Sequence, residues 1–156
     1  MIHYLDENVI IFINKKSLEL TDESDRHHIL HYGDLHLVVD FVMERFDEDI
    51  KQKALAYCVS LIVLHPFQDD NYRTSVESAH QFLLMNDFQF TADYKKMIEL
   101  EKWRMKYEKQ HELERTFFTI TSIENEAEKK NKIEQVMQSE YGITIKKWLD
   151  AYYQKN

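Results

Sequence analysis

The chain contains few of the residues that interrupt helices. Its 156 residues include only 2 glycines and 1 proline. Tight turns between strands usually need these residues, because their backbone geometry suits the turn. Their scarcity argues against a strand-rich architecture and favours helices joined by short polar connections. We therefore predict an all-α fold. The hydrophobic content of 44% is enough to build one proper core.

Cysteine is almost absent, since Cys58 is the only one. A single thiol cannot form an intramolecular disulfide framework or a paired-cysteine metal site. The N-terminal segment carries early acids and no basic cluster, which is not typical of a secretory signal peptide. No apolar run approaches the roughly 18 residues that span a membrane. We expect a cytoplasmic protein with no membrane partner.

Surplus positive charge is also lacking, because the formal net charge is -8. Proteins that bind nucleic acids use an excess of lysine and arginine to displace counterions from the phosphates. A polybasic membrane-binding surface needs the same excess. We expect neither a nucleic acid nor a membrane surface as a partner.

Hydrophobic periodicity predicts a series of helices along the chain. We expect helices over residues 6–16, 35–46, 50–64, 71–86, 91–113, 124–140 and 143–153, a loop or short hairpin at 19–34, and a short extended piece at 116–123. The segment 54–64 is apolar on nearly every side, so it predicts a central, buried helix. Gly142 is expected to separate the last two helices. We predict a core of residues 1–110 with a helical extension, residues 111–156, packed on it.

The residues with chemical potential are concentrated between two of these helices. His65 ends the apolar helix, and the imidazole of a histidine is a common general base. Asp69 and Asp70 precede the next helix, whose N-terminal N–H groups favour anions. A carboxylate beside a phosphate site often holds Mg²⁺. Arg73 adds a fork of hydrogen-bond donors in the first turn of that helix.

Together these residues are typical of group transfer from a nucleotide phosphate to a hydroxyl. Phe67 would plug the core and fix the loop. Simpler interpretations exist for each residue alone. A histidine at a helix end is often structural, Asp69 to Asn71 could merely cap the helix, and Arg73 could pair with Asp69 on the surface.

The loop also resembles the signature of the Fic/Doc (Fido) family, His-x-Phe-x-(Asp/Glu)-(Gly/Ala)-Asn-(Gly/Lys)-Arg. The signature positions that match are His65, Phe67, Asp69, Asn71 and Arg73. The following Thr-Ser pair, and the apolar helix that ends in Asn-Asp at residues 86–87, are similar to the Doc branch. The resemblance covers roughly residues 35–90 and implies a Fido-like helical bundle, here with a helical C-terminal extension.

The resemblance implies a transferase that uses Mg²⁺ and ATP, or another nucleotide, to modify a hydroxyl of a target protein. Fic proteins usually transfer AMP, whereas Doc is a toxin that transfers a phosphoryl group and is silenced by an antitoxin. By position, His65 would be the base and Asp69 would hold Mg²⁺. Asp70, Asn71 and Arg73 would bind the nucleotide phosphates. Residues 19–34 would be the flap that holds the target, with His27, His28 and His31 as exposed loop histidines.

Three positions depart from the family pattern. Asp70 stands where the family has Gly or Ala, Tyr72 where it has Gly or Lys, and Val76 where Fic proteins have a second Arg. A carboxylate at position 70 would repel phosphate unless it points away or binds a metal. The alternative is therefore a catalytically degenerate Fido module that acts by binding. A third possibility is an unrelated helical interaction protein.

Overall fold

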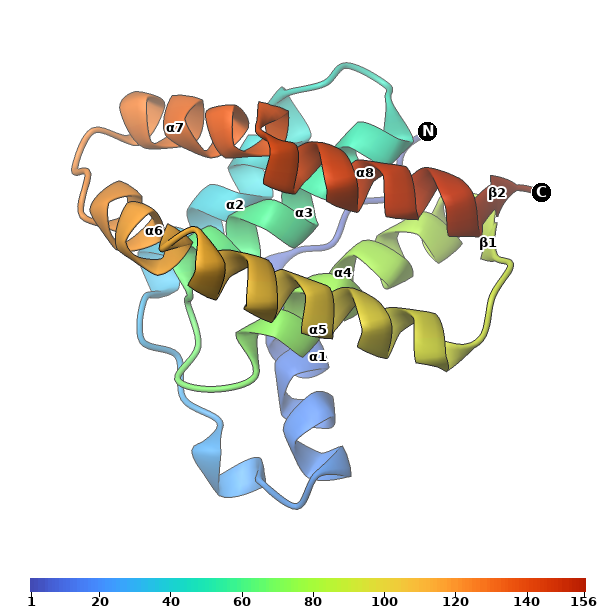
Figure 1. Cartoon of the computed structure of the whole chain (residues 1–156), viewed down its shortest axis with the longest axis horizontal. Coiled ribbons are helices and arrows are strands. Elements are labelled where there is room, and N and C mark those ends of the chain that lie inside the picture. Colours follow the sequence, from blue (N-terminus) through green and yellow to red (C-terminus); the bar gives the residue numbers. More distant parts are fainter.

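The computed structural model describes all residues, 1–156, and it confirms the all-α prediction. Eight α-helices and one 3-10 helix are accompanied by a single two-stranded sheet (Figure 1). The elements are α1 (Glu7–Leu20), η1 (Ser24–Arg26), α2 (Tyr32–Glu44), α3 (Ile50–Leu64), α4 (Asn71–Met85), β1 (Phe88–Phe90), α5 (Tyr94–Gln110), α6 (Leu113–Thr121), α7 (Glu126–Gln138), α8 (Glu140–Tyr152) and β2 (Tyr153–Lys155). None of these helices combines the length and apolarity needed to cross a bilayer.

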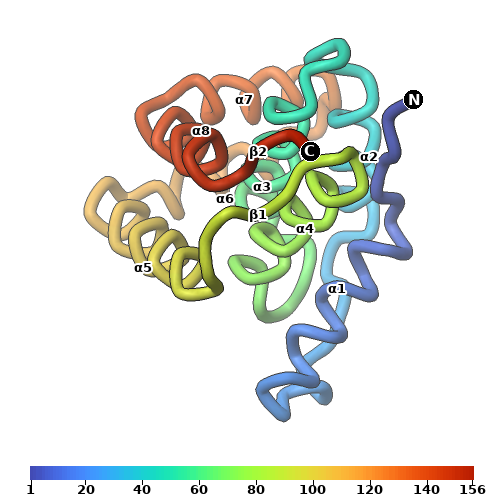
Figure 2. The backbone as a smooth tube through the Cα atoms, turned by 90° about the vertical axis from the view of Figure 1, so that its right-hand side faces the viewer, coloured from blue at the N-terminus to red at the C-terminus, as the bar shows by residue number.

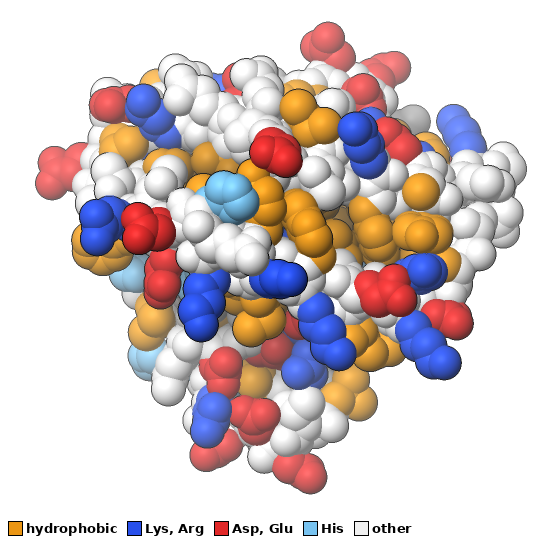
Figure 3. Space-filling model, in the orientation of Figure 1, with side chains coloured by type: hydrophobic (Ala, Val, Ile, Leu, Met, Phe, Trp, Pro, Cys, Tyr) orange, Lys and Arg blue, Asp and Glu red, His pale blue; other side chains and the backbone are white.

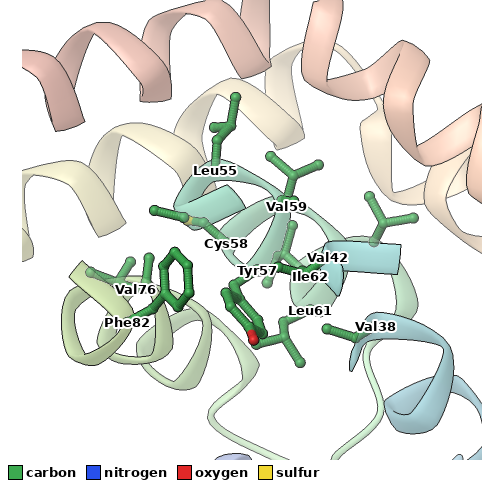
Figure 4. Packing of buried hydrophobic residues seen from close by; sticks show 14 of the residues in the cluster. Val38, Val42, Leu55, Tyr57, Cys58, Val59, Leu61, Ile62, Val76 and Phe82 are labelled. Atoms are coloured by element: carbon green, nitrogen blue, oxygen red, sulfur yellow. The ribbon is translucent and has the colours of Figure 1, made fainter. Parts of the chain in front are cut away.

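Helix α3 lies at the centre of the fold, as its apolar sequence predicts. Every residue from Lys53 to Leu64 is buried, and α2, α4, α6, α7 and α8 all contact the helix. Figure 4 shows α3 side chains such as Tyr57 and Ile62 between those of α2 and α4. The carboxylate of Asp49 caps the N-terminus of α3 by accepting a hydrogen bond from the N–H of Gln52. Because α3 is fixed on all sides, its C-terminal end is a rigid platform for the loop that follows.

The N-terminal arm, α1 together with η1, extends away from the body of the molecule (Figures 1 and 2). The buried stripe of α1 is mixed, because Ile10 and Ile13 are followed by the polar Asn14 and Ser17. This stripe faces α4, with which α1 makes most of its contacts. The arm therefore meets the start of α4 through polar as well as apolar groups.

The C-terminal helices contribute to the same core as the N-terminal ones. Phe117, Ile120, Ile133 and Ile145 are buried in the single hydrophobic cluster that includes α3. Strands β1 and β2 pair antiparallel, which ties the C-terminal end of the chain to the segment after α4. The face that carries α5 and α8 shows apolar side chains between acidic and basic ones (Figure 3).

Two local predictions are wrong. Residues 113–121 form helix α6 rather than an extended piece, because Phe117 and Ile120 are spaced to bury one helical face. Gly142 does not separate the last helices, since it lies in the first turn of α8 and the break falls at Ser139. A Cβ at position 142 would overlap with the backbone of Met137, so this glycine permits a close approach of the α7 end.

The predicted helix over 91–113 is also shorter than expected. Helix α5 ends at Gln110, and Glu112 adopts a left-handed backbone with φ of 52° before α6 begins. A residue other than glycine with positive φ is uncommon. The bend at Glu112 turns α6 back toward α3. A hollow remains between α6 and the end of α3, and the candidate site lies there.

Candidate functional site

The loop between α3 and α4 turns sharply at both of its ends. His65 is the C-cap of α3 with φ of 46°, and Asp70 is the N-cap of α4 with φ of 66°. Both values lie in the left-handed region that glycine occupies most readily. Asp70 therefore retains the backbone conformation that a glycine would give at this position. The loop is compact even though it contains no glycine.

The tautomer of His65 is set by its neighbour. Ring nitrogen Nδ1 contacts the carbonyl oxygen of Ile62, one turn back in α3. A carbonyl can only accept a hydrogen bond, so Nδ1 carries the proton and Nε2 of the neutral ring is left as the basic nitrogen. The His65 side chain is exposed, and its ring stands edge-on to Tyr72 with 6.4 Å between the centroids. His65 is thus oriented to accept a proton through Nε2.

His65 also lines a cleft with a volume of about 1110 Å³. This cleft lies between the end of α3, the start of α4, the C-terminal half of α5 and helix α6. Its lining is mixed, with apolar side chains such as Val63 and Phe118 beside charged ones such as Lys109 and Arg115. A cavity of this size can hold a ligand as large as a nucleotide.

Phe67 and Asn71 hold the loop together. Phe67 is buried, as expected for a core plug. The Asn71 side chain accepts a hydrogen bond from the Phe67 N–H at 3.2 Å and donates one to the Phe67 carbonyl at 2.8 Å. Both functional groups of Asn71 are therefore engaged within the loop. Only its backbone N–H remains to contact a phosphate.

The expected flap region lies directly against this loop. Ile29 forms an antiparallel bridge with Phe67, and the Gln68 N–H donates to the His28 carbonyl at 2.8 Å. The Leu30 N–H donates to the Pro66 carbonyl at 2.8 Å. Residues 28–31 thus run beside residues 66–68 in extended form. His31 lines the cleft, while the His27 ring is half-buried and contacts Asn14 at 2.8 Å.

Asp69 is bound from two directions. One carboxylate oxygen accepts the N–H of Asp70 at 2.7 Å, and the other pairs with Arg26 of η1 at 3.1 Å. The pair with Arg26 is largely exposed to solvent, so its contribution to stability is small. Mg²⁺ commonly uses one or two protein carboxylates together with substrate phosphates. Asp69 offers one such carboxylate, and no group of three or more potential metal ligands is present.

Asp70 and Arg73 pair with each other, and neither lines the cleft. Arg73 Nε lies 3.4 Å from an Asp70 oxygen, and the other Asp70 oxygen accepts a hydrogen bond from the Ser17 hydroxyl. Burial raises the pKa of Asp70 above its usual value, although Ser17 and Arg73 act in the opposite direction. The carboxylate does not cap α4, because it makes no hydrogen bond to the helix N-terminus. It points sideways, toward α1.

The predicted site residues therefore fall on two sides of the loop. His65 lines the cleft, whereas Asp69, Asp70 and Arg73 are engaged with α1 and η1. No side chain accepts a hydrogen bond from the first backbone N–H groups of α4.

A buried polar network beneath the cleft was not anticipated from the sequence. The hydroxyls of Tyr72 and Tyr141 donate to the two oxygens of Glu108, each at 2.7 Å. Arg104 is fully buried and donates to the Tyr141 hydroxyl at 2.9 Å and to Ser75 at 2.8 Å. The pKa of Tyr72 is raised by burial and by its bond to Glu108.

The spacing of α5 contained a signal for this network. Met97 and Leu100 begin an inward stripe, and Arg104 and Glu108 continue it at helical spacing. Charged residues at such positions predict a buried pair rather than a solvated face. In the same way, Asn14 and Ser17 continue the inward stripe of α1.

The chain matches no protein-family model, and the comparisons with curated proteins and with solved structures gave no match.

Proposed function

We propose that the chain is a Fic/Doc-like transferase that moves a phosphate-containing group from a nucleotide to a hydroxyl of a target protein. The observation that carries this proposal is the orientation of His65. Its Nδ1 is bound to Ile62, which leaves Nε2 as a base on the wall of a cleft large enough for a nucleotide. A base held in this way suits the removal of a proton from an attacking hydroxyl.

The start of α4 supports the phosphate-binding half of the proposal. Its first N–H groups have no side-chain cap, since Asp70 turns toward Ser17. A helix N-terminus with free donors attracts anions. Arg73 lies in the first turn and would add a bidentate contact once released from Asp70. The backbone of Asn71 would contribute a donor, and Asp69 would hold Mg²⁺, which neutralises phosphate charge when bound.

In the proposed reaction, His65 Nε2 takes the proton of the target hydroxyl while the hydroxyl oxygen attacks phosphorus. Attack at the α-phosphorus of ATP breaks its bond to the β-phosphate oxygen, transfers AMP and releases pyrophosphate. Attack at the γ-phosphorus transfers a phosphoryl group and releases ADP. The extended segment 28–31, which borders the loop and reaches the cleft at His31, would align the target. An antitoxin would then act by covering this region.

The test is transfer of label from ATP. The protein is incubated with Mg²⁺, a cell lysate and ATP labelled at either the α- or the γ-phosphate. Label from the α-phosphate alone identifies AMP transfer, and label from the γ-phosphate alone identifies phosphoryl transfer. Labelling from both positions would be inconsistent with a single type of transfer. His65→Ala should abolish labelling, and His3→Ala, which changes an exposed histidine near the C-terminal end of α4, should retain it. Labelling that survives His65→Ala contradicts the proposal.

A second candidate function is a catalytically degenerate Fido module that acts by binding. It is favoured by one observation, namely that Arg73 is engaged with Asp70 and with the Ser17 carbonyl at 3.3 Å. A binding module would need neither the base nor the guanidinium. If expression of the protein affects cell growth equally in wild type and His65→Ala, and no labelled product forms, the binding function is supported.

A further inference from the structure

One residue of α1 contacts both members of the Asp70–Arg73 pair. The Ser17 hydroxyl donates to the Asp70 carboxylate, and the Ser17 carbonyl accepts a hydrogen bond from Arg73 at 3.3 Å. Ser17 is buried, and the Asp70 side chain is only 11% exposed. The three groups therefore form a closed triangle between α1 and the start of α4.

A second residue of α1 strengthens the same attachment. The Asn14 side chain donates to the Asp69 carbonyl and to the Thr74 hydroxyl, each at 3.0 Å. Asn14 is completely buried. Since Asn14 and Ser17 lie on one face of α1, this face holds the loop and the first turn of α4 together. At the tip of the arm, Arg26 continues the attachment to Asp69.

The charges around Arg73 are satisfied without a ligand. Asp70 pairs with it from the loop, and the half-buried Glu101 of α5 faces the same pair. A phosphate approaching the start of α4 would therefore meet two carboxylates and a guanidinium that is already occupied. Like charges at this distance disfavour binding of an anion.

We propose that α1 is an autoinhibitory clasp, in which Ser17 holds the Asp70 carboxylate on Arg73 so that the guanidinium cannot bind a phosphate until the clasp opens. The proposal rests on the proposed function, because it takes Arg73 as a phosphate-binding residue. In this state Asp70 acts as an internal substitute for the phosphate. The arm extends from the body (Figure 2), so a partner could reach α1 without entering the cleft.

The experiment measures binding of inorganic pyrophosphate in the presence of Mg²⁺ by calorimetry. Asp70→Asn keeps the size of the side chain but removes its charge, and Ser17→Ala removes the hydroxyl that orients it. Both should raise the affinity at least roughly fivefold, the lower end of typical coupling between two states. Asp87→Asn is the matched control, because it is the same substitution at an exposed left-handed position beyond the other end of α4. It should leave the affinity unchanged.

Amide hydrogen exchange of residues 11–20 supplies a readout that does not need a ligand. The clasp predicts faster exchange in this segment for Asp70→Asn and Ser17→Ala, while α3 stays as protected as in wild type. That comparison also reports whether each variant is folded.

The outcomes separate the clasp from the proposed function. Tighter binding in both variants, abolished by adding Arg73→Gln, supports the clasp. Equal binding in wild type and variants, still dependent on Arg73, overturns the clasp and leaves the phosphate site intact. Absence of binding in wild type and in both folded variants overturns the clasp and the phosphate-binding half of the proposed function together.

Discussion

The hydroxyl of Tyr72 donates a hydrogen bond of 2.7 Å to the carboxylate of Glu108. This bond links the loop that carries His65 to helix α5. The second oxygen of Glu108 binds Tyr141 of α8, so the cleft is connected to the C-terminal part of the chain. Arg104, whose guanidinium lies 5.7 Å from the centre of the Tyr72 ring, supplies the positive charge of this network.

Replacement of Arg104 should strongly destabilise the protein. Arg104→Met would remove the buried guanidinium that donates to Tyr141 and Ser75, and the loss of hydrogen bonds to a charged group should cost about 1.5–3 kcal/mol of unfolding free energy for each bond. Lys106→Met, on the exposed side of the same helix, should change it by less than about 0.5 kcal/mol. Urea unfolding followed by circular dichroism measures both. Equal stability of the two variants would show that the network does not stabilise the fold.

The two glycines should respond oppositely to alanine. At Gly142 an added Cβ would overlap with the Met137 backbone, so Gly142→Ala should destabilise by about 1–3 kcal/mol or more. At Gly33, in the first turn of α2, nothing lies within 4 Å of the added atom. Gly33→Ala should therefore stabilise the helix by up to about 1 kcal/mol. Thermal unfolding compares the two. A Gly142→Ala protein as stable as wild type would disprove the close approach of α7 and α8.

Acid should lower the folding stability through protonation of His80, which contacts Tyr153 near the C-terminal end of the chain. Its ring is half-buried, contacts the Tyr153 hydroxyl at 2.6 Å, and packs edge-on to Phe90. Burial lowers the pKa of His80, and the nearby Glu77 only partly opposes this effect. The unfolded chain then binds the proton more readily than the folded chain. Stability is therefore lost as the pH falls below about 6.5 toward the lower folded pKa, by at most about 1.4 kcal/mol per pH unit.

The measurement for His80 is the unfolding free energy between pH 5 and pH 8. His80→Gln should reduce the pH dependence, and His111→Gln, at an exposed histidine, should retain the wild-type slope. If the slope is the same in wild type and His80→Gln, burial of His80 does not couple protonation to folding.

Much of the helical framework could be predicted from the sequence, because the long segments have clear periodicity and caps. Helix α3 agrees with its prediction from first residue to last, since it is apolar all round and follows a strong N-cap at Asp49. The region after Gln110 was less predictable. There, β-branched and aromatic residues such as Phe117 and Ile120 suggested extension, but burial against α3 decides in favour of a helix.

The residues of the candidate site could be predicted from the sequence, but the contacts that they make could not. The sequence placed His65 and Asp69 at the loop and Arg73 in the first turn of the next helix, and the structure has them there. The sequence could not show that Asp70 would turn to Ser17, because that contact joins residues 53 positions apart in the chain. Long-range contacts of this kind depend on how α1 packs, and local patterns do not specify it.

The most direct test of the account is a titration of the isotopically labelled protein with ATP and Mg²⁺, followed by the backbone amide signals in NMR spectra. We expect the largest shifts at residues 69–74 and at residues lining the cleft around His65, with larger shifts at the same ATP concentration in Asp70→Asn, in which Arg73 is released. A titration to millimolar ATP that leaves these amides unchanged, or that shifts only residues far from the loop, would contradict the proposed nucleotide site.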